Sequence, residues 1–264
     1  MDEFTTTISQ KGSELYRDMP WRNDTRPYYI LVSELMLQQT QVGRVIPKFL
    51  AFISVFPDES SLASASLADV LKQWQGLGYN RRAKYLHDSA KRIVSVFNGN
   101  FPDNYDDILS LPGVGKNTCG AISAYAFNRP SVFIETNVRT VFIHHFFAGY
   151  DAVSDAAIHE ILAKTIDGEH PREFYWALMD YGSWLKANGI RNISRSKHYT
   201  KQSALVGSVR QMRGSIIKAL AVGETTEHQL RRDVNADSRF DRALLGLLSD
   251  GLIAQSGDGI HLTK

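Results

Sequence analysis

The chain has 264 residues, of which 43% are hydrophobic and 22% are charged, and its formal net charge at pH 7 is +2. This length is enough to bury the core of one large domain or two smaller ones, while the small net charge does not by itself indicate a nucleic-acid partner. The single cysteine, Cys119, excludes an internal disulfide framework and any zinc or iron–sulfur site held by several cysteines.

Helical patterns cover most of the chain. Pro27 suits the first turn of a helix, and Tyr28, Leu31 and Leu35 recur at the three- and four-residue spacing of one buried helical face. Ser66 is a predicted N-cap, and glycines end the segment that it begins. The segments with a helical pattern after residue 60 are 66–79, 81–97, 104–111, 117–127 and 170–185.

The stretch LPGVG, residues 111–115, joins two of these helical segments. Gly113 and Gly115 can take the positive φ that a tight turn between helices demands, and they let backbone N–H groups approach a ligand closely. The helix that follows adds the N–H groups and the dipole of its first turn, so a phosphate is the expected ligand. The alternative is an ordinary corner between two helices.

Charge is distributed unevenly along the chain. Between Arg191 and Lys218 there are seven basic residues and no acidic one, with glycine, serine and asparagine among them. This pattern favours a strip that follows the phosphates of a nucleic acid, and the alternative is a solvated linker.

Residues 207–264 form a compact C-terminal segment. Three helices are predicted, over 208–222, 225–235 and 237–251. The expected helix signals are the caps Thr225 or Thr226 and Asp237, and the stop Gly251. Two short strands around residues 256–259 follow, and three helices before a β-hairpin is the order of a winged helix. Because many winged helices bind protein and not DNA, the pattern indicates the fold more than the partner.

Several motifs together resemble a known family. The stretches SELMLQQTQV, GLGY and LPGVGKNTCGAISAYAF follow, in order and spacing, the helix-hairpin-helix (HhH-GPD) DNA glycosylases, and among them the MutY-type adenine glycosylases. The resemblance covers roughly residues 19–186. It implies an all-α, two-lobed glycosylase fold, to which the pattern of residues 207–264 adds a C-terminal winged helix. The implied parts are one lobe of 1–26 plus 134–190, a second lobe of 27–133 with the hairpin, a basic linker of 191–206 and a winged helix of 207–264.

The resemblance also implies roles for the second lobe. Glu34 matches the glutamate that protonates the base, which is needed because a neutral purine leaves poorly. Tyr79 matches a tyrosine that supports the distorted strand, with ordinary packing as the alternative. The base pocket and the wedge into the opened duplex are matched by Gln38, Gln39, Thr40 and Gln41.

Glu135 matches the family's sugar-facing aspartate, which stabilises an oxocarbenium-like transition state. Glutamate is one methylene longer, so the alternative is a site that binds damage without cutting, whereas Asn137 matches the family's asparagine and favours a maintained site. Asn117 stands where relatives with lyase activity carry a lysine, and an amide cannot form a Schiff base. Lys116 points elsewhere, by about 100° around the helix. The resemblance therefore implies a monofunctional enzyme.

Contacts to DNA phosphates and cofactors follow from the same resemblance. The expected phosphate contacts are Gly113, Val114, Gly115, Lys116, Arg195, Lys197 and Lys201. The four cysteines that hold the family's iron–sulfur cluster do not occur after residue 186, so we expect no cofactor apart from a monovalent or divalent ion at the hairpin. We expect no counterpart of the 8-oxoguanine-sensing domain of MutY enzymes, because the predicted winged helix takes its place.

The implied function is a monofunctional DNA repair glycosylase. It flips a mispaired or damaged base, with adenine as the expected base, out of double-stranded DNA and hydrolyses the N-glycosidic bond to leave an abasic site. One alternative is a mismatch glycosylase for thymine, uracil or a modified pyrimidine, although thymine-mismatch relatives usually differ in the glutamine run and carry a tyrosine at the position of Asn117. The other is a non-catalytic lesion-binding protein.

Localisation and assembly are expectations of the same kind. The first residues have no signal-peptide pattern, and no apolar run approaches the roughly 20 residues of a membrane span. We therefore expect a cytoplasmic monomer with no membrane contact, associated with the nucleoid if its source is bacterial or archaeal.

Overall fold

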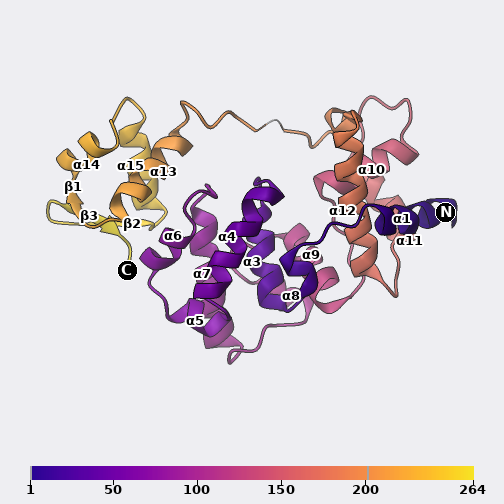
Figure 1. The fold of residues 1–264 in the computed structure, drawn as a ribbon, viewed down its shortest axis with the longest axis horizontal. Helices are drawn as coiled ribbons and strands as arrows, with labels where there is room; N and C mark the ends of the chain where they lie inside the picture. Colours follow the sequence, from indigo (N-terminus) through magenta and orange to yellow (C-terminus); the bar gives the residue numbers. More distant parts are fainter. Residues whose placement is uncertain (1, 201) are drawn as a thin grey trace. The chain divides into compact units, whose positions relative to one another are not determined.

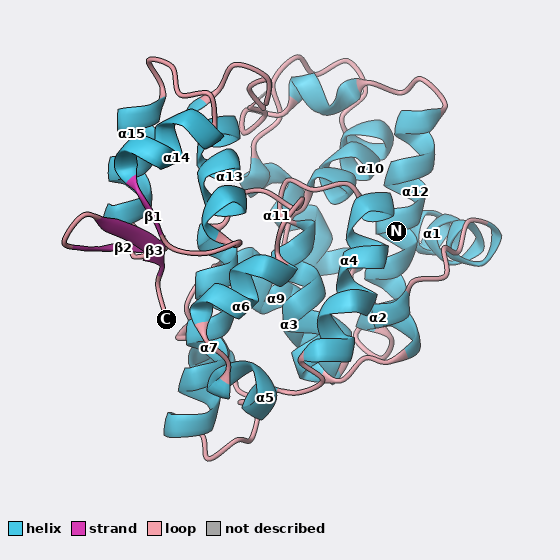
Figure 2. Cartoon of the chain, turned by 60° about the vertical axis from the view of Figure 1, so that its left-hand side comes forward, coloured by secondary structure: helices cyan, strands magenta, loops and turns pink. Residues whose placement is uncertain are grey.

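The computed structural model describes residues 2–200 and 202–264, and it confirms the predicted helical fold. Helices follow one another along nearly the whole chain, with one small sheet near the C-terminus (Figures 1 and 2). The chain divides into two compact units. The first unit consists of Met1–Ile30, Asp103–Ser110 and Val114–Lys201, and the second of Leu31–Pro102, Leu111–Gly113 and Gln202–Lys264.

Most elements belong wholly to one unit. The first unit contains α1 (Asp2–Glu14), α2 (Pro20–Asn23), α8 (Tyr105–Leu109), α9 (Lys116–Phe127), α10 (Thr136–Phe146), α11 (Asp155–Thr165), α12 (Pro171–Ala187) and the 3-10 helix η1 (Asn192–Arg195). The second contains most of α3 (Pro27–Leu37), and α4 (Val42–Val55), α5 (Glu59–Ser64), α6 (Leu67–Gln73), α7 (Arg81–Val96), α13 (Val209–Leu220), α14 (Glu227–Asp233), α15 (Phe240–Ser249) and the strands β1 (Thr225–Thr226), β2 (Ile253–Ser256) and β3 (Gly259–Leu262).

The core of the first unit forms where α12 packs against α1 and α10. Small residues allow these helices to approach one another closely. A Cβ added at Gly182 of α12 would lie 2.6 Å from the backbone oxygen of Asn137 on α10, and one at Gly12 of α1 would lie 2.8 Å from the Cβ of Ala177. The backbone of α10 next to Asn137 can therefore rest directly on α12.

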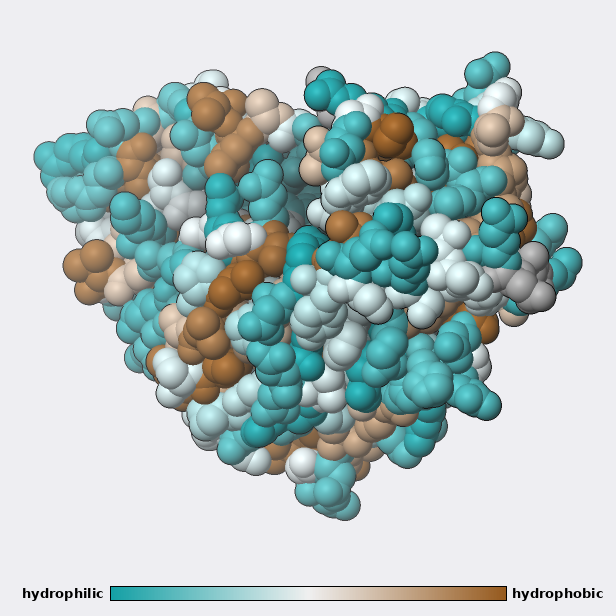
Figure 3. Space-filling model, turned by 45° about the vertical axis from the view of Figure 1, so that its right-hand side comes forward, coloured by the Kyte–Doolittle hydropathy of each residue, from teal (hydrophilic) through white to brown (hydrophobic). Residues whose placement is uncertain are grey.

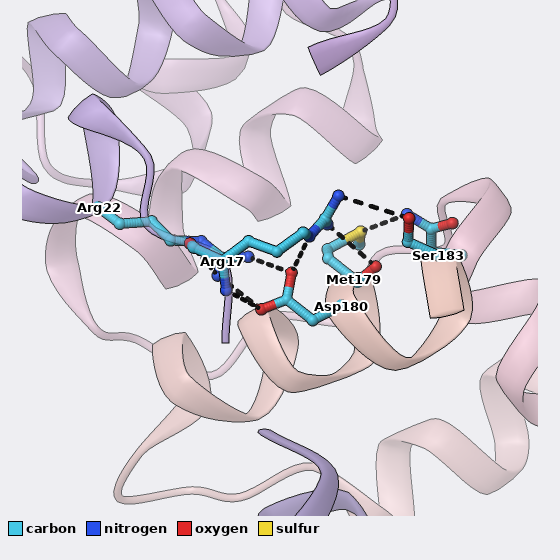
Figure 4. Close-up of polar contacts among 6 residues, drawn as sticks. Arg17, Arg22, Met179, Asp180 and Ser183 are labelled. Carbon is cyan, nitrogen blue, oxygen red and sulfur yellow. Dashed lines mark hydrogen bonds and ion pairs between the residues drawn. The ribbon is translucent and has the colours of Figure 1, made fainter. Parts of the chain in front are cut away.

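A buried ion cluster fixes the other side of α12. Asp180 has a side chain that is 1% exposed, and it accepts hydrogen bonds from Arg17 Nε (2.6 Å) and from Arg22 Nη1 (2.7 Å), as Figure 4 shows. The Arg22 guanidinium also lies over the rings of Tyr16 and Trp176, each 5.2 Å from the ring centroid. A buried charge of this kind requires its partners, so Asp180 holds the segment after α1 against α12.

The second unit is built around α7. Its apolar face buries Ala83, Leu86, Ala90 and Ile93 where it packs against α5 and α6. The predicted cap of α6 is confirmed, because Ser66 Oγ accepts a hydrogen bond from the backbone N–H of residue 69 at 3.1 Å.

The C-terminal segment has the predicted helices and hairpin. Thr226 caps α14, Gly251 ends α15 with a φ of 66°, and β2 and β3 pair with Ser256 opposite Gly259. The third strand, β1, was not predicted because two residues carry no alternation. The strand order is β1-β3-β2 (Figure 2).

The expectation that Asp237 caps the third helix is wrong. The helix α15 begins at Phe240, and the Asp237 carboxylate instead accepts hydrogen bonds from the backbone N–H of Arg239 (2.9 Å) and from its guanidinium. Because this carboxylate is held by a residue only two positions away, it closes a turn in front of the helix.

One face of the molecule is predominantly polar. Hydrophilic side chains cover most of the face drawn in Figure 3, with apolar side chains in short stretches between them. Among the described residues, no helix combines the length and the apolar character that a membrane crossing requires.

We expect the substitution Gly182→Ala to destabilise the protein, because the added methyl group would overlap the backbone of α10. Overpacking of this kind lowers the free energy of unfolding by about 1–3 kcal/mol. Gly214→Ala is the matched control, since Gly214 lies within α13 and a Cβ there meets no atom within 4 Å. This control should raise the free energy of unfolding by about 0.5–1 kcal/mol. Equal effects of both substitutions in chemical denaturation would contradict the packing described.

Candidate active site

Glu135 stands at the N-terminus of α10, in the first unit. It is the N-cap residue with an extended backbone (φ −97°), but its own carboxylate makes no capping hydrogen bond to the helix. The side chain is half-buried, and burial raises the pKa of Glu135, an effect opposed by the nearby positive charge of Arg139. The Arg139 guanidinium itself is bound to Asp155 by two hydrogen bonds of 2.7 Å. The Glu135 carboxylate is thus half-buried at the positive end of a helix dipole.

The backbone before Glu135 is pinned from two sides. Asn117, on the first turn of α9, donates from Nδ2 to the carbonyl oxygen of Ile134 at 3.0 Å. The Tyr175 hydroxyl donates to the carbonyl oxygen of Ser131 (2.8 Å) and accepts from the backbone N–H of Phe133 (3.2 Å). These bonds fix the position at which α10 begins and therefore the place of the Glu135 side chain.

Asn137 lies in the first turn of the same helix. Its Nδ2 is 3.7 Å from Sδ of Met179 on α12, and its Oδ1 is buried with no hydrogen-bond partner among residues 2–200 and 202–264. A buried amide oxygen without a donor is uncommon and marks a place where a ligand or a water molecule can donate. Glu135, Asn137 and Asn117 are therefore all clustered around the start of α10.

The hairpin turn confirms one glycine prediction and corrects the other. Gly113 has a φ of 78°, and an added Cβ would lie 2.7 Å from the Cβ of Tyr85. Gly115 has a φ of −90° and not the expected positive value, because it is the N-cap of α9 and an N-cap is extended. No atom lies within 4 Å of an added Cβ at Gly115, so the first turn of α9 is open to a ligand there. Val114 is buried and Lys116 is exposed. Phosphate binding here, and an ion at the hairpin, stay predictions.

Glu34 lies on α3 in the second unit. It is half-buried, and its neighbours Leu31 and Leu35 are completely buried. The helix ends at Leu37, and Gln39 follows with a left-handed backbone (φ 56°). Gln38 and Thr40 are half-buried in this turn, whereas Gln39 and Gln41 are exposed.

Arg82 is a buried residue that the sequence did not single out. Its guanidinium bridges the end of α3 and the loop before α7. Nη1 lies within hydrogen-bonding distance of the carbonyl oxygens of Leu35 (2.5 Å), Met36 (3.0 Å) and Gln38 (2.7 Å). Nη2 lies within that distance of the carbonyl oxygens of Leu77 (3.2 Å) and Gly78 (3.1 Å) and of Thr40 Oγ1 (3.2 Å).

The charge of Arg82 is stabilised by carbonyl dipoles. Burial lowers the pKa of Arg82 to about 10, which leaves the guanidinium charged at neutral pH. A cation at the C-terminal end of α3 also interacts favourably with the helix dipole. The only sequence signal was an arginine at the start of an amphipathic helix, in a position that the helical period places on the buried face.

Tyr79 has a left-handed backbone (φ 48°) and a half-buried ring. Two guanidinium groups lie near this ring, that of Arg82 at 5.5 Å and that of Arg210 at 4.7 Å from its centroid. The Tyr79 hydroxyl is hydrogen-bonded to Arg210 Nη1 and accepts from Gln202 Nε2 at 2.6 Å. The side chain therefore connects the loop before α7 to α13.

Three of the basic residues expected to contact phosphates belong to the segment after α12, and their surroundings differ. Arg195 donates to the backbone oxygens of Tyr150 and Phe147 and so holds the turn at residues 147–150. Lys197 is exposed, and its backbone N–H donates to the carbonyl oxygen of Val153 at 2.9 Å. Lys201 lies outside the described residues.

The residues do not suit a cluster held by four cysteines. The chain has one cysteine, Cys119, which is buried in α9 with its Sγ 3.3 Å from the carbonyl oxygen of Tyr105. Burial raises the pKa of the Cys119 thiol to about 11, so this sulfur is a poor source of thiolate. The segment after α12 forms η1, and Asn192 on it donates to the carbonyl oxygen of Thr140 at 2.9 Å.

Comparison with known proteins places these features in context. The family described as "HhH-GPD superfamily base excision DNA repair protein" matches residues 32–166. The adenine DNA glycosylase of Mycolicibacterium smegmatis is 35% identical over 264 residues, which cover 92% of this chain and 90% of that protein. The adenine DNA glycosylase of Buchnera aphidicola is 38% identical over 191 residues, 70% of this chain, and the chain spans 54% of its length. The solved structure of a thermostable thymine-DNA glycosylase is 29% identical with a TM-score of 0.64, covering 69% of this chain and 85% of that one.

We expect Arg82→Met to destabilise the second unit strongly, because several buried carbonyl groups would lose their donor. One such group costs about 1–3 kcal/mol, so the free energy of unfolding should fall by more than about 3 kcal/mol. Arg82→Lys, which keeps the charge but not the planar fork, should have an intermediate effect. The control Arg242→Met removes an exposed arginine and should change the free energy of unfolding by less than about 0.5 kcal/mol. Denaturant titration that ranked Arg82→Met with this control would refute the bridging role.

Proposed function

Since the chain belongs to the HhH-GPD superfamily of base excision DNA repair proteins, we propose that it is a DNA glycosylase that removes adenine from double-stranded DNA. The observation that carries this proposal is the half-buried Glu135 carboxylate at the N-terminus of α10, which is placed by backbone bonds and makes no capping bond of its own. A carboxylate prepared in this way suits the stabilisation of positive charge that develops on a sugar. The adenine DNA glycosylases named above support adenine as the base.

The two acids have different roles in this proposal. Glu34 donates a proton to the departing base, which turns a poor leaving group into a better one. Glu135 faces the deoxyribose and stabilises the oxocarbenium-like transition state, and a water molecule then completes the hydrolysis. The buried Oδ1 of Asn137 offers an acceptor next to Glu135 for a group of the substrate or for that water.

The same geometry supports monofunctional chemistry. The amide of Asn117 has no nucleophilic nitrogen, and it is occupied in holding the carbonyl oxygen of Ile134. The enzyme would release the base and leave the strand intact at an abasic site. We also propose that it works without an iron–sulfur cluster, which the single buried Cys119 supports. Gln38, Gln39, Thr40 and Gln41 would line the base pocket, with the turn at Gly113 to Lys116 and the basic residues Arg195, Lys197 and Lys201 on phosphates.

A second candidate is a mismatch glycosylase for a pyrimidine. The similarity to a thermostable thymine-DNA glycosylase favours it. A panel of duplexes that hold different mispaired or damaged bases, assayed with and without alkali, separates the two. We propose that cleavage appears only after alkali and only for adenine. Cleavage at thymine would favour the second candidate, and tight binding without any base release would favour a lesion-binding protein.

The substitution Glu34→Gln tests the general acid. It keeps the size of the side chain but removes the proton, and a general acid contributes a factor of about 10² to 10⁴ to the rate. We expect single-turnover adenine release to slow by that factor while binding to the duplex is retained. Glu160→Gln, which changes an exposed glutamate on α11, should leave the rate unchanged. Normal release by Glu34→Gln would exclude the role.

The pH dependence tests Glu135. Its carboxyl group must be ionised to stabilise a cation, and burial raises its pKa above the ordinary value. The rate should therefore fall as the pH drops through a value above the ordinary glutamate pKa of about 4.3. A carboxyl group whose pKa is raised on folding binds its proton more readily in the folded state than in the unfolded state. Protonation of Glu135 therefore does not unfold the protein, and the rate should fall at a higher pH than the one at which acid unfolds the protein. A rate that stays constant until circular dichroism reports unfolding would rule out an ionised Glu135.

A further inference from the structure

A groove of about 820 Å³ lies in the second unit between the turn at residues 39–41, the loop at 75–80 and the helix α13. A hollow of about 420 Å³ adjoins it and shares Gln39, Tyr79 and Arg210 with it. The wall formed by α13 belongs to the C-terminal segment, which has no part in the chemistry proposed above.

The larger groove carries positive charge without acidic residues. Arg44 and Lys48 of α4 line one side, Arg210 and Lys218 of α13 line another, and no aspartate or glutamate contributes to the lining. None of these four side chains forms an ion pair with a carboxylate in the described part of the chain. Arg44 and Lys218 are exposed, and Lys48 and Arg210 are half-buried.

The adjoining hollow contains one acidic residue. Arg81 at the start of α7 and Arg213 on α13 both form ion pairs with Asp250, whose side chain is 9% exposed. The distance from Arg213 Nη2 to Asp250 Oδ2 is 2.5 Å. Because these two pairs hold α13 against α7, Arg81 and Arg213 are engaged in a structural contact, whereas the four cations of the groove have no carboxylate partner among the described residues.

Two of the groove cations are held in place. The Arg210 guanidinium donates to the carbonyl oxygen of Ser203 at 3.0 Å and rests over the ring of Tyr79. The Lys48 side chain lies across the turn at Gly76, where an added Cβ would be 3.5 Å from its Cε. The positions of these charges are therefore fixed before any ligand arrives, which lowers the entropy lost on binding.

We propose that this groove binds the sugar–phosphate backbone of DNA, so that the C-terminal segment is part of the DNA-binding surface through α13. The proposal rests on the proposed function, which supplies the DNA. Phosphodiester groups recur at regular intervals and suit cations presented from two walls, and the amides of Gln75 and Gln211 in the lining donate and accept hydrogen bonds, as sugar and phosphate oxygens require.

The third helix of the C-terminal segment is less suited to this task. On α15, Leu245 is 65% exposed, and the Asp241 carboxylate is paired with Arg231. An apolar side chain and an acid on the outer face of α15 oppose contact with phosphates. The usual expectation for a winged helix, in which the third helix enters the major groove, is therefore not the arrangement that we infer.

The test is the salt dependence of binding to an undamaged duplex, measured by fluorescence anisotropy with the full chain. Log K falls as log salt rises, and each cation that contacts a phosphate makes this negative slope steeper by about 0.9. We expect Lys48→Gln and Lys218→Gln each to reduce the magnitude of the slope by about 0.9, and the double variant to reduce it by about 1.8. Arg242→Gln, which removes an exposed charge on α15, should lower it by less.

Two outcomes would contradict the proposal. Slopes for the groove variants equal to that of Arg242→Gln, with unchanged melting temperatures, would overturn it. Polyglutamate that binds as tightly as the duplex at equal ionic strength, and loses affinity in the same variants, would reassign the groove to an acidic protein. Adenine release by the unsubstituted chain is measured separately, so a failure of the glycosylase proposal can be distinguished from a failure of the groove proposal.

Discussion

The carbonyl groups left over where a helix stops need donors, and in the second unit one guanidinium group supplies them. Arg82 joins the last carbonyl oxygens of α3 to those of the loop at Leu77 and Gly78. The turn after α3 and the loop that carries Tyr79 are therefore tied to each other. Glu34 lies on the same helix, one turn before Gln38, so Arg82 helps to fix the end of the helix that carries the proposed acid.

The first unit positions its acid by another means. The glycine at 182 lets the backbone of α10 rest on α12, and Asp180 fixes α12 from its other side through two arginines. Asn117 then holds the residue before Glu135. Because all of these contacts involve backbone atoms or neighbouring side chains, the Glu135 carboxylate is placed without using its own hydrogen-bonding capacity, which stays available to a substrate.

Local signals in the sequence predicted much of the fold, since helix starts and stops depend on near neighbours. Ser66, Thr226 and Gly251 act as expected. Asp237 and Gly115 do not, because a carboxylate that can close a turn competes with capping, and an N-cap glycine is extended. The hydrogen bond from Arg82 to Leu35 joins residues 47 positions apart, and the one from Asn117 to Ile134 joins residues 17 positions apart. Such pairings depend on tertiary packing, which no window of sequence contains. The chemical identity of the candidate site came from motif resemblance, whereas the place of each side chain came from the structure.

The left-handed backbones of Gln39 and Tyr79 have an implication for how this protein tolerates change. A non-glycine residue in that conformation costs about 1–2 kcal/mol, and both positions line the basic groove. Glycine would relieve the backbone but would remove an amide and an aromatic ring from the surface. At Gln39, whose side chain is exposed, selection for heat resistance alone would thus favour glycine at the expense of the groove. At Tyr79 the hydrogen bonds from Arg210 and Gln202 would be lost with the ring, so stability and surface chemistry there favour the same residue.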